Sequence, residues 1–354
     1  MTLLALLASA SGGSQPPDPD PPTPGAFDAR ADDPAAVLPY AMPTAAPYNA
    51  PTYCGTPTAD GTGSTVHPGV VDMGPGNTWQ GYRYWMAVTG YYNTDDRQEN
   101  PHILVSQNGY WWRPPPGLTR IPLYAAPPEP RFNSDTDIEY DADNDRMVLI
   151  YREQQADTTQ QTFIATSTDG ITWPTTATAL DWDRPNGNGQ IVSPAIIRRG
   201  PGDWWIFGLG RDSLKLYAWQ ASDPLGRWHN GAGVSGYRDL GWPQLQVAET
   251  GDKPWHLDVT WDGGKFRALL DLGPRYMGNS DGYRVGTSDG TGAFTWAPGH
   301  VMDLAPSGWD DIELYRATLT PHENGTHYRV WYSAEGDDSW RTGLTLLPKS
   351  LWPA

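Results

Sequence analysis

The sequence predicts an all-β fold, a five-bladed β-propeller preceded by an extended proline-rich N-terminal arm. The first observation is a composition rich in tryptophan (18), tyrosine (18), glycine (39) and proline (35), which suits short strands joined by many turns. The second is a pair of sequence units that recurs from residue 63 onward, as repeat architectures require. No sustained helical periodicity free of glycine and proline is present.

The first repeated unit is a serine, a tight turn and a tryptophan. It occurs at 106–112 and at 167–173, and looser copies end at Trp228 and Trp296. Asn-Gly and Asp-Gly pairs favour hairpin turns because they tolerate positive φ. The tryptophans at 112, 173, 228 and 296 are 61, 55 and 68 residues apart, which leaves room for one four-stranded sheet in each repeat.

The second unit is a short strand with a polar start and a β-branched middle, followed by an aromatic strand. Five copies imply five blades around a central channel, with the first strand of each blade innermost. A two-sheet sandwich is the competing fold, but it predicts no such periodicity. The predicted inner strands are 67–71, 136–140, 193–197, 257–261 and 315–319. The strands that follow them are 82–90, 146–151, 204–209, 266–270 and 328–332.

Residues 1–62 form the predicted arm, and residues 63–354 form the predicted propeller. The arm holds 12 of the 35 prolines and a single basic residue, Arg30, so it should behave as a stiff, extended spacer. It begins with the apolar decapeptide 1–10, which we expect to anchor the arm in a larger assembly. The alternative is a secretory signal, although no basic residue precedes the apolar run. The run is too short to span a bilayer, so no membrane span is expected.

Charge and residue usage narrow the possible partners and cofactors. A net charge of −17 makes nucleic acid a poor partner, and none is expected. The lone cysteine, Cys54, excludes an intrachain disulfide and a thiolate metal cluster. The histidine spacing indicates no zinc site, and neither a phosphate-binding glycine loop nor a serine nucleophile elbow occurs. We therefore expect no metal and no cofactor.

Several segments resemble the five-bladed propellers of the glycoside hydrolase family 43 type, in particular the propeller domains of phage tail and bacterial surface proteins. The resemblance covers about residues 63–350. It rests on Thr65-Val66-His67-Pro68-Gly69-Val70-Val71, on Tyr84-Trp85-Met86-Ala87, and on segments 99–103, 137–141 and 314–316. It implies carbohydrate as the ligand. It also implies one aspartate from each of blades one and two, and a glutamate from blade three, as catalytic residues.

Only one of these three carboxylates is in its implied place. Asp137 matches in blade two, whereas blade one has His67-Pro68-Gly69 and blade three has Ser193-Pro194-Ala195. The candidate catalytic residues are therefore Asp137, Asp258 and Glu313, and the candidate ligand-binding residues are His67, His256, Arg316 and Glu99. We expect Asp137, Asp258 and Arg316 to converge at one mouth of the channel, with both histidines close by. The alternative is that the two aspartates only satisfy backbone N–H groups.

The missing carboxylates favour binding without turnover. The sequence thus predicts an extracellular virion component, a phage minor tail or receptor-binding protein. Residues 1–62 would join it to other tail proteins, and the channel mouth would bind host cell-surface glycan. The alternative is a secreted or virion-borne glycoside hydrolase that acts on a cell-wall or plant-type polysaccharide with replacement carboxylates. A purely architectural propeller is the third hypothesis, and it predicts a channel filled by side chains.

Overall fold

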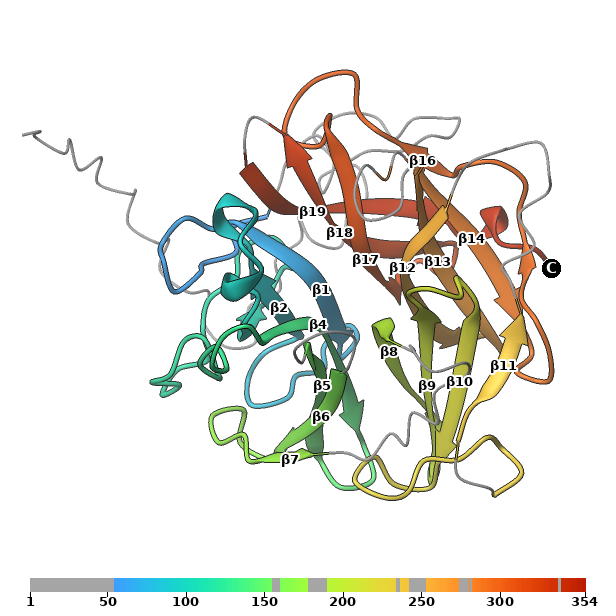
Figure 1. Ribbon diagram of the computed structural model, residues 1–354, viewed down its shortest axis with the longest axis horizontal. Coiled ribbons are helices and arrows are strands. Elements are labelled where there is room, and N and C mark those ends of the chain that lie inside the picture. Colours follow the sequence, from blue (N-terminus) through green and yellow to red (C-terminus); the bar gives the residue numbers. More distant parts are fainter. Residues whose placement is uncertain are drawn as a thin grey trace, which may run out of the picture.

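The computed structural model describes residues 54–154, 160–177, 190–233, 236–241, 253–273, 280, 282–336 and 339–354. It contains five antiparallel sheets that follow one another in chain order around a central axis (Figure 1). The predicted five-bladed propeller is confirmed. Most of the predicted arm, including its apolar decapeptide, lies outside the described residues. Within the described part, no helix has the length and apolarity that crossing a bilayer requires.

Each blade begins with its innermost strand and proceeds outward. The innermost strands are β1 (Thr65–Asp72), β4 (Phe132–Asp141), β8 (Ile191–Gly200), β12 (Lys253–Asp262) and β17 (Glu313–Pro321). The second strands are β2 (Tyr84–Gly90), β5 (Arg146–Gln154), β9 (Asp203–Gly210), β13 (Lys265–Gly273) and β18 (His327–Gly336). The third are β3 (Pro101–Ser106), β6 (Gln160–Ser167), β10 (Leu216–Ala221), β14 (Gly282–Ser288) and β19 (Ser339–Pro348). All five predicted inner strands are therefore correct.

The outermost strands are short and differ between blades. They are β7 (Thr175–Ala177), β11 (Arg238–Gly241), β15 (Thr295–Trp296) and β16 (Met302–Asp303). Blades one and five contain three strands each among the described residues, so the expected four-stranded sheet is not uniform. In blade one the fourth strand is reduced to a single bridge between Val105 and Arg113. Three 3₁₀ turns complete the elements: η1 (Tyr92–Thr94), η2 (Asp96–Gln98) and η3 (Lys349–Leu351).

The repeated serine–turn–tryptophan unit fixes the turn after the third strand. In blade two the Ser167 hydroxyl accepts the backbone N–H of Gly170, and the Trp173 indole N–H donates to the Gly170 carbonyl at 3.1 Å. Gly170 has a φ of 73°, and a side chain at this position would collide with the Trp85 ring of blade one. The unit therefore holds each blade against its neighbour, and glycine is required for both its backbone conformation and its small size.

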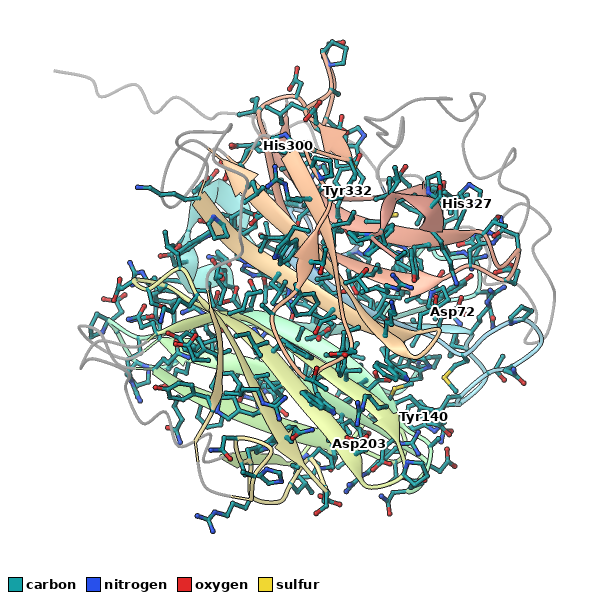
Figure 2. All side chains as sticks on the ribbon, turned by 90° about the vertical axis from the view of Figure 1, so that its right-hand side faces the viewer. Asp72, Tyr140, Asp203, His300, His327 and Tyr332 are labelled. Atoms are coloured by element: carbon teal, nitrogen blue, oxygen red, sulfur yellow. The ribbon has the colours of Figure 1, made fainter. Side chains whose placement is uncertain are left out.

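Apolar side chains fill the spaces between neighbouring sheets (Figure 2). One buried cluster joins blades one and two, and it includes Trp85 and Leu149. Another joins blades three and four, where Phe207 packs edge-on against Phe266. Because each blade buries its faces only against its two neighbours, the propeller is held by these seams rather than by one central core.

The innermost strand of every blade contains a β-bulge at the same place. Each strand pairs with its neighbour on either side of two residues that have no register partner. The first of these residues has a left-handed backbone in three blades, with φ of 58° at His67, 49° at Asp135 and 53° at Ser193. The five bulges are His67-Pro68, Asp135-Thr136, Ser193-Pro194, Trp255-His256 and Tyr315-Arg316.

Residues 54–62 belong to the propeller and not to an arm that extends away from it. The Cys54 N–H donates to the Thr342 carbonyl of blade five at 2.6 Å, and the Trp112 N–H of blade one donates to the Gly55 carbonyl at 2.9 Å. Cys54 is buried, with only 2% of its surface exposed. This segment therefore links the first blade to the last, and the predicted boundary at residue 63 is too late by at least nine residues.

A pair of truncations tests this closure. A chain that starts at residue 63 should lose on the order of 2–4 kcal/mol of unfolding free energy relative to a chain that starts at residue 54, because the bridging hydrogen bonds and the buried Cys54 are gone. Urea unfolding measures the difference. Equal stability of the two chains would contradict the role assigned to residues 54–62.

Candidate functional site

Three bulge side chains from three different blades meet inside the channel. His67 of blade one, Asp135 of blade two and His256 of blade four each offer one ligand atom, and these atoms lie within 4.8 Å of one another. The His67 Nε2 atom is 2.9 Å from Asp135 Oδ1. All three side chains are buried, and His67 Nε2, Asp135 Oδ1 and His256 Nε2 make no hydrogen bond among the described residues. We call these three residues the central cluster.

The hydrogen bonds around His67 determine which of its ring nitrogens carries the proton. The Thr89 hydroxyl donates to the Val66 carbonyl at 3.1 Å, so toward His67 Nδ1, also at 3.1 Å, it can only accept. The proton of the neutral ring therefore sits on Nδ1, and a lone pair on Nε2 faces the Asp135 carboxylate. Two lone pairs at 2.9 Å repel each other, so either a proton or a metal cation must lie between these two atoms.

Asp135 is anionic because its surroundings favour the charged form. Burial alone would raise the pKa of its carboxyl, but the Arg152 guanidinium beside it holds that pKa well below the usual range. The Arg152 Nε–H donates to Asp135 Oδ2, which also accepts the Ser193 N–H at 3.1 Å. Oδ2 is thus fully occupied, which leaves Oδ1 for the other members of the central cluster.

His256 is held at the same depth in the channel by two polar contacts. Its Nδ1 lies 2.5 Å from the Ser193 hydroxyl, and its backbone N–H donates to the Asp271 carboxylate. Burial lowers the pKa of His256 well below its usual value, and burial also lowers the pKa of His67. The ring of Tyr315 packs against both, with centroid distances of 4.1 Å to His256 and 5.2 Å to His67. Both imidazoles are therefore neutral at neutral pH.

Two neutral imidazoles and one carboxylate are a donor set for a divalent cation such as Zn²⁺ or Mn²⁺. The fit rests on three observations: one ligand atom of each residue lies within 4.8 Å of the others, all three side chains are buried, and His67 Nε2 and Asp135 Oδ1 make no hydrogen bond among the described residues. The sequence did not indicate this cluster because its members are 68 and 121 residues apart, at positions 67, 135 and 256. Only the ring of blades brings them together.

A pocket opens at the N-terminal ends of the innermost strands, next to the central cluster. This N-side pocket encloses about 440 Å³. Its walls include Trp255, Tyr315 and Trp340, together with the predicted site residues Glu99 and Glu313. Arg152, which contacts Asp135, also lines it. The pocket therefore offers aromatic surfaces and carboxyl groups beside a candidate cation site, as carbohydrate chemistry requires.

Glu99 is a carboxyl group that contacts the central cluster from the N-side pocket. Its Oε2 atom accepts from the Ser134 hydroxyl and lies 3.4 Å from His67 Nδ1. Burial, and then the negative charge of Asp135, raise the pKa of Glu99 well above its usual range. These two effects favour the protonated carboxyl, which is the form that can donate a proton within the pocket.

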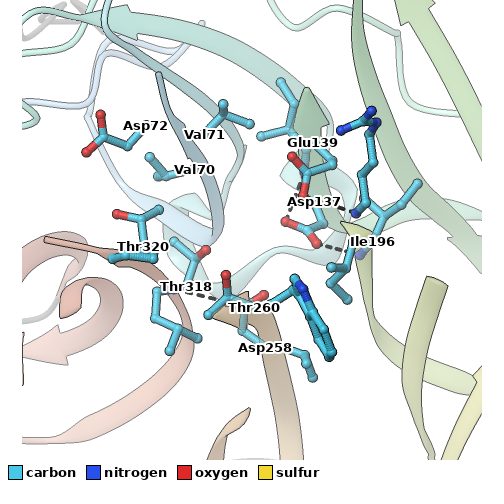
Figure 3. Close-up of a pocket in the computed structure, with 17 residues that line it drawn as sticks. Val70, Val71, Asp72, Asp137, Glu139, Ile196, Asp258, Thr260, Thr318 and Thr320 are labelled. Carbon is cyan, nitrogen blue, oxygen red and sulfur yellow. Dashed lines mark hydrogen bonds between the residues drawn. The ribbon is translucent and has the colours of Figure 1, made fainter. Parts of the chain in front are cut away.

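A second pocket lies at the C-terminal ends of the same strands, and it contains two of the predicted site residues. This C-side pocket encloses about 240 Å³ and is lined by Asp137 and Asp258 (Figure 3). Asp137 accepts the backbone N–H of Ile196 in blade three at 2.8 Å, and Asp258 accepts that of Leu319 in blade five at 3.0 Å. Both aspartates therefore link neighbouring blades. This agrees with the alternative given for them, that they satisfy backbone N–H groups.

The structure brings Arg316 and Asp137 together and places His67 and His256, which were expected close by, in the central cluster. Arg316 is fully buried and lies 3.9 Å from Asp137, with its Nη2 atom donating to the Pro194 carbonyl at 3.0 Å. His67 and His256, however, belong to the central cluster, and they adjoin the N-side pocket rather than the aspartates. The candidate residues are thus distributed over three levels of the channel.

The register of the sheets explains this distribution. The blade-two counterpart of His67 and Ser193 is Asp135, because all three are the first residue of a bulge. Asp137 instead corresponds to Gly69 and Ala195, the first paired residues after the bulge. The repeats compared along the sequence begin at 67, 136 and 193, so blade two was one residue out of register and Asp135 fell just outside the compared segment.

The protonation of Asp137 gives a testable pH dependence. Burial raises the pKa of Asp137 to about 6, although Arg316 and two backbone N–H groups oppose the shift. Between pH 4 and 6 the folded state keeps a proton that the unfolded chain has released, so this residue's contribution to stability falls as pH rises.

The wild type should therefore lose on the order of 2–3 kcal/mol of stability relative to Asp137→Asn between pH 4 and pH 7. Urea unfolding of both proteins across this range measures the difference. Asn at this position also loses one acceptor, which changes the offset between the two curves but not their divergence with pH. Parallel curves would contradict a protonated Asp137.

Comparison with known proteins places the fold in a carbohydrate-active group. No protein-family model matches the chain. It is 25% identical over 321 residues to the A type blood N-acetyl-α-D-galactosamine deacetylase of Flavonifractor plautii. The match covers 77% of this chain and 40% of the relative, so the chain spans about two fifths of the length of that curated protein.

Solved structures agree with this match. An N-acetylgalactosamine deacetylase from F. plautii, in complex with blood group B trisaccharide, superposes with a TM-score of 0.70 and 21% identity, over 85% of this chain and 95% of that one. An endo-arabinase from Bacteroides thetaiotaomicron gives 0.57 and 12%, over 84% and 97%. A family 43 β-1,3-galactosidase gives 0.52 and 11%, over 84% and 94%.

These findings correct the predicted function and support the predicted fold. The expectation of a phage tail protein that binds glycan without turnover is wrong, because the curated relative is an enzyme that acts on an N-acetylated sugar. The alternative, an enzyme of carbohydrate processing, agrees better with the relatives. The chain is a five-bladed β-propeller of the glycoside hydrolase family 43 type.

Proposed function

We propose that this propeller is a hydrolase that removes the acetyl group from an N-acetylated amino sugar bound in the N-side pocket. The central cluster of His67, Asp135 and His256 carries this proposal, because it is a buried set of cation ligands beside a pocket with aromatic walls. The deacetylase from F. plautii supports the same chemistry. The overall reaction consumes one water and yields acetate and a protonated amine.

Hydrolysis of an amide needs an electrophilic carbonyl and a protonated leaving nitrogen. A divalent cation bound at the central cluster would polarise the acetyl carbonyl and lower the pKa of a bound water. The protein keeps the ligands ready for such an ion, since Asp135 is anionic beside Arg152 and both histidines are neutral. The bulges fix these side chains in place before any substrate arrives.

Glu99 is the residue best placed to supply the proton for the leaving nitrogen. Its carboxyl lines the N-side pocket and lies beside His67, and burial raises its pKa well above the usual range, which favours the protonated form. Glu99 gives one proton to the leaving nitrogen and takes one from the attacking water, so it is protonated again at the end of each cycle. The indole rings of Trp255 and Trp340 provide flat apolar surfaces against which a sugar ring can pack.

Glycoside hydrolysis is the second candidate function, and one observation favours it. Glu99 and Glu313 both line the N-side pocket, and a glycosidase needs two carboxyl groups there. This reaction leaves the central cluster without a direct role. The implied acids of blades one and three are also replaced by His67 and Ser193. Deacetylation uses the unusual residues of this chain, and glycoside hydrolysis does not.

The products separate the two functions. With Mn²⁺ or Zn²⁺ present, methyl 2-acetamido-2-deoxy-α-D-galactopyranoside and chitin oligomers should yield acetate and free amine in equal amounts, without new reducing ends. Asp135→Asn and His67→Ala should each lower the rate at least a thousandfold, since the cation site loses a ligand. Proton NMR detects the acetate.

Two further variants complete this experiment. Glu99→Gln should lower kcat by about 10²–10⁴-fold, as expected for loss of a general acid. Glu129→Gln is the matched control, because the Glu129 side chain is 82% exposed and forms only a surface ion pair with Arg97. Reducing ends without acetate, abolished by Glu313→Gln, would reject deacetylation in favour of glycoside hydrolysis.

A further inference from the structure

Two buried hydrogen-bond donors in the walls of the N-side pocket have no acceptor among the residues that the structure describes. They are the Nε2 amide of Gln190, which precedes β8 in blade three, and the Nε1 indole N–H of Trp340 in blade five. Gln190 is 1% exposed and Trp340 is 4% exposed. A buried donor without an acceptor has lost its hydrogen bonds to water without replacing them, which is unfavourable. Such a group in a pocket wall therefore indicates a ligand atom that can accept the hydrogen bond.

The orientation of the Gln190 amide is fixed by its neighbour. The Arg211 Nη1–H donates to Gln190 Oε1 at 2.5 Å, and the Arg211 backbone N–H donates to the Gln190 carbonyl at 2.8 Å. A guanidinium can only donate, so the amide oxygen must face Arg211 and the NH₂ group must point elsewhere. Gln190 is therefore held at both ends with its donor unused.

The Trp340 indole differs from the other indole of the same pocket. Trp255 donates its Nε1–H to the Tyr315 hydroxyl at 3.4 Å, whereas that of Trp340 meets no acceptor. The Trp340 ring is fixed by edge contacts with Tyr91 and Tyr315, at centroid distances of 5.6 and 5.1 Å. Its N–H therefore cannot be satisfied by a simple rotation of the ring.

We propose that Gln190 and Trp340 donate to the two sugar oxygens that flank the acetamido group, O1 and O3. This inference rests on the proposed function. Blades one, two and four supply the central cluster, and blades three and five supply these two donors, so all five blades contribute to one site. In any 2-acetamido-2-deoxy glycoside, the carbon that bears nitrogen has an oxygen on each neighbouring carbon. A sugar with its acetyl group at the cluster thus presents an acceptor on both sides.

This assignment makes the two side chains positioning residues rather than catalytic ones. The unpaired group of each side chain is a donor, and the glycosidic O1 is an acceptor only, so the pairing is chemically matched. The pair recognises the oxygens next to C2 and not the configuration at C4. We therefore expect galacto and gluco acetamido sugars to depend equally on both residues.

Ligand affinity tests the proposal without relying on turnover. Gln190→Leu and Trp340→Phe should each raise the Kd for methyl 2-acetamido-2-deoxy-α-D-galactopyranoside about tenfold by NMR titration, since each removes one buried hydrogen bond. Gln190→Glu, which keeps the shape but replaces the donor by an acceptor, should weaken binding further. Gln160→Leu is the matched control. Its amide nitrogen also lacks a partner, but the residue is not among those that line the pocket.

The 3-deoxy analogue identifies the oxygen. The wild type should bind the 3-deoxy analogue about tenfold more weakly than it binds the parent glycoside. This difference should disappear in the variant that has lost the donor to O3. Trp340→Phe should also unfold at or above the wild-type temperature, because an unsatisfied donor has been removed.

The outcomes distinguish this inference from the proposed function. If acetate is released but both variants bind the glycoside like the wild type, the donors bind ordered water only and the inference is overturned. An equal loss for the 3-deoxy analogue in the wild type and both variants would also overturn it. If the variants weaken binding as expected but no acetate is released, the recognition stands and deacetylation fails. Failure of the wild type to bind any acetamido glycoside would overturn both.

Discussion

The site depends on one backbone irregularity, the two-residue bulge that recurs in the innermost strand of every blade. A regular strand would alternate its side chains between the two faces of the sheet and could not direct successive residues into the channel. The bulge breaks this alternation, and His67, Asp135 and Ser193 adopt left-handed backbone angles to do so. Such angles are unfavourable for residues other than glycine and persist only where the surrounding structure holds them.

Hydrogen bonds between blades hold the bulges in this conformation. The Thr136 hydroxyl donates to the His67 carbonyl, and the Ser193 N–H donates to Asp135, so blades one, two and three are connected at the level of the bulges. Asp271 accepts the backbone N–H of His256 and fixes the blade-four bulge from the second strand. The same contacts that close the ring therefore position the cation ligands, which couples the stability of the propeller to the geometry of its site.

The sequence was sufficient for the fold because a propeller is a repeat, and the same pattern of strands recurs in every blade. It was not sufficient for the site. The one-residue register error in blade two, which left Asp135 outside the compared segment, arose because a bulge leaves no mark in the pattern of apolar residues. The central cluster was missed because its ligands come from three blades, so they have no characteristic spacing along the chain. His67 and His256 were identified as candidates, but the carboxylate that joins them was not.

Diffraction at the Mn²⁺ or Zn²⁺ absorption edge from crystals grown with that ion tests the central claim most directly. The claim is that the bulges of blades one, two and four form a cation site. It predicts one strong anomalous peak about 2.0–2.3 Å from His67 Nε2, Asp135 Oδ1 and a ring nitrogen of His256, absent in Asp135→Asn. No peak in the channel, or a peak only among the carboxylates of the C-side pocket, would contradict it.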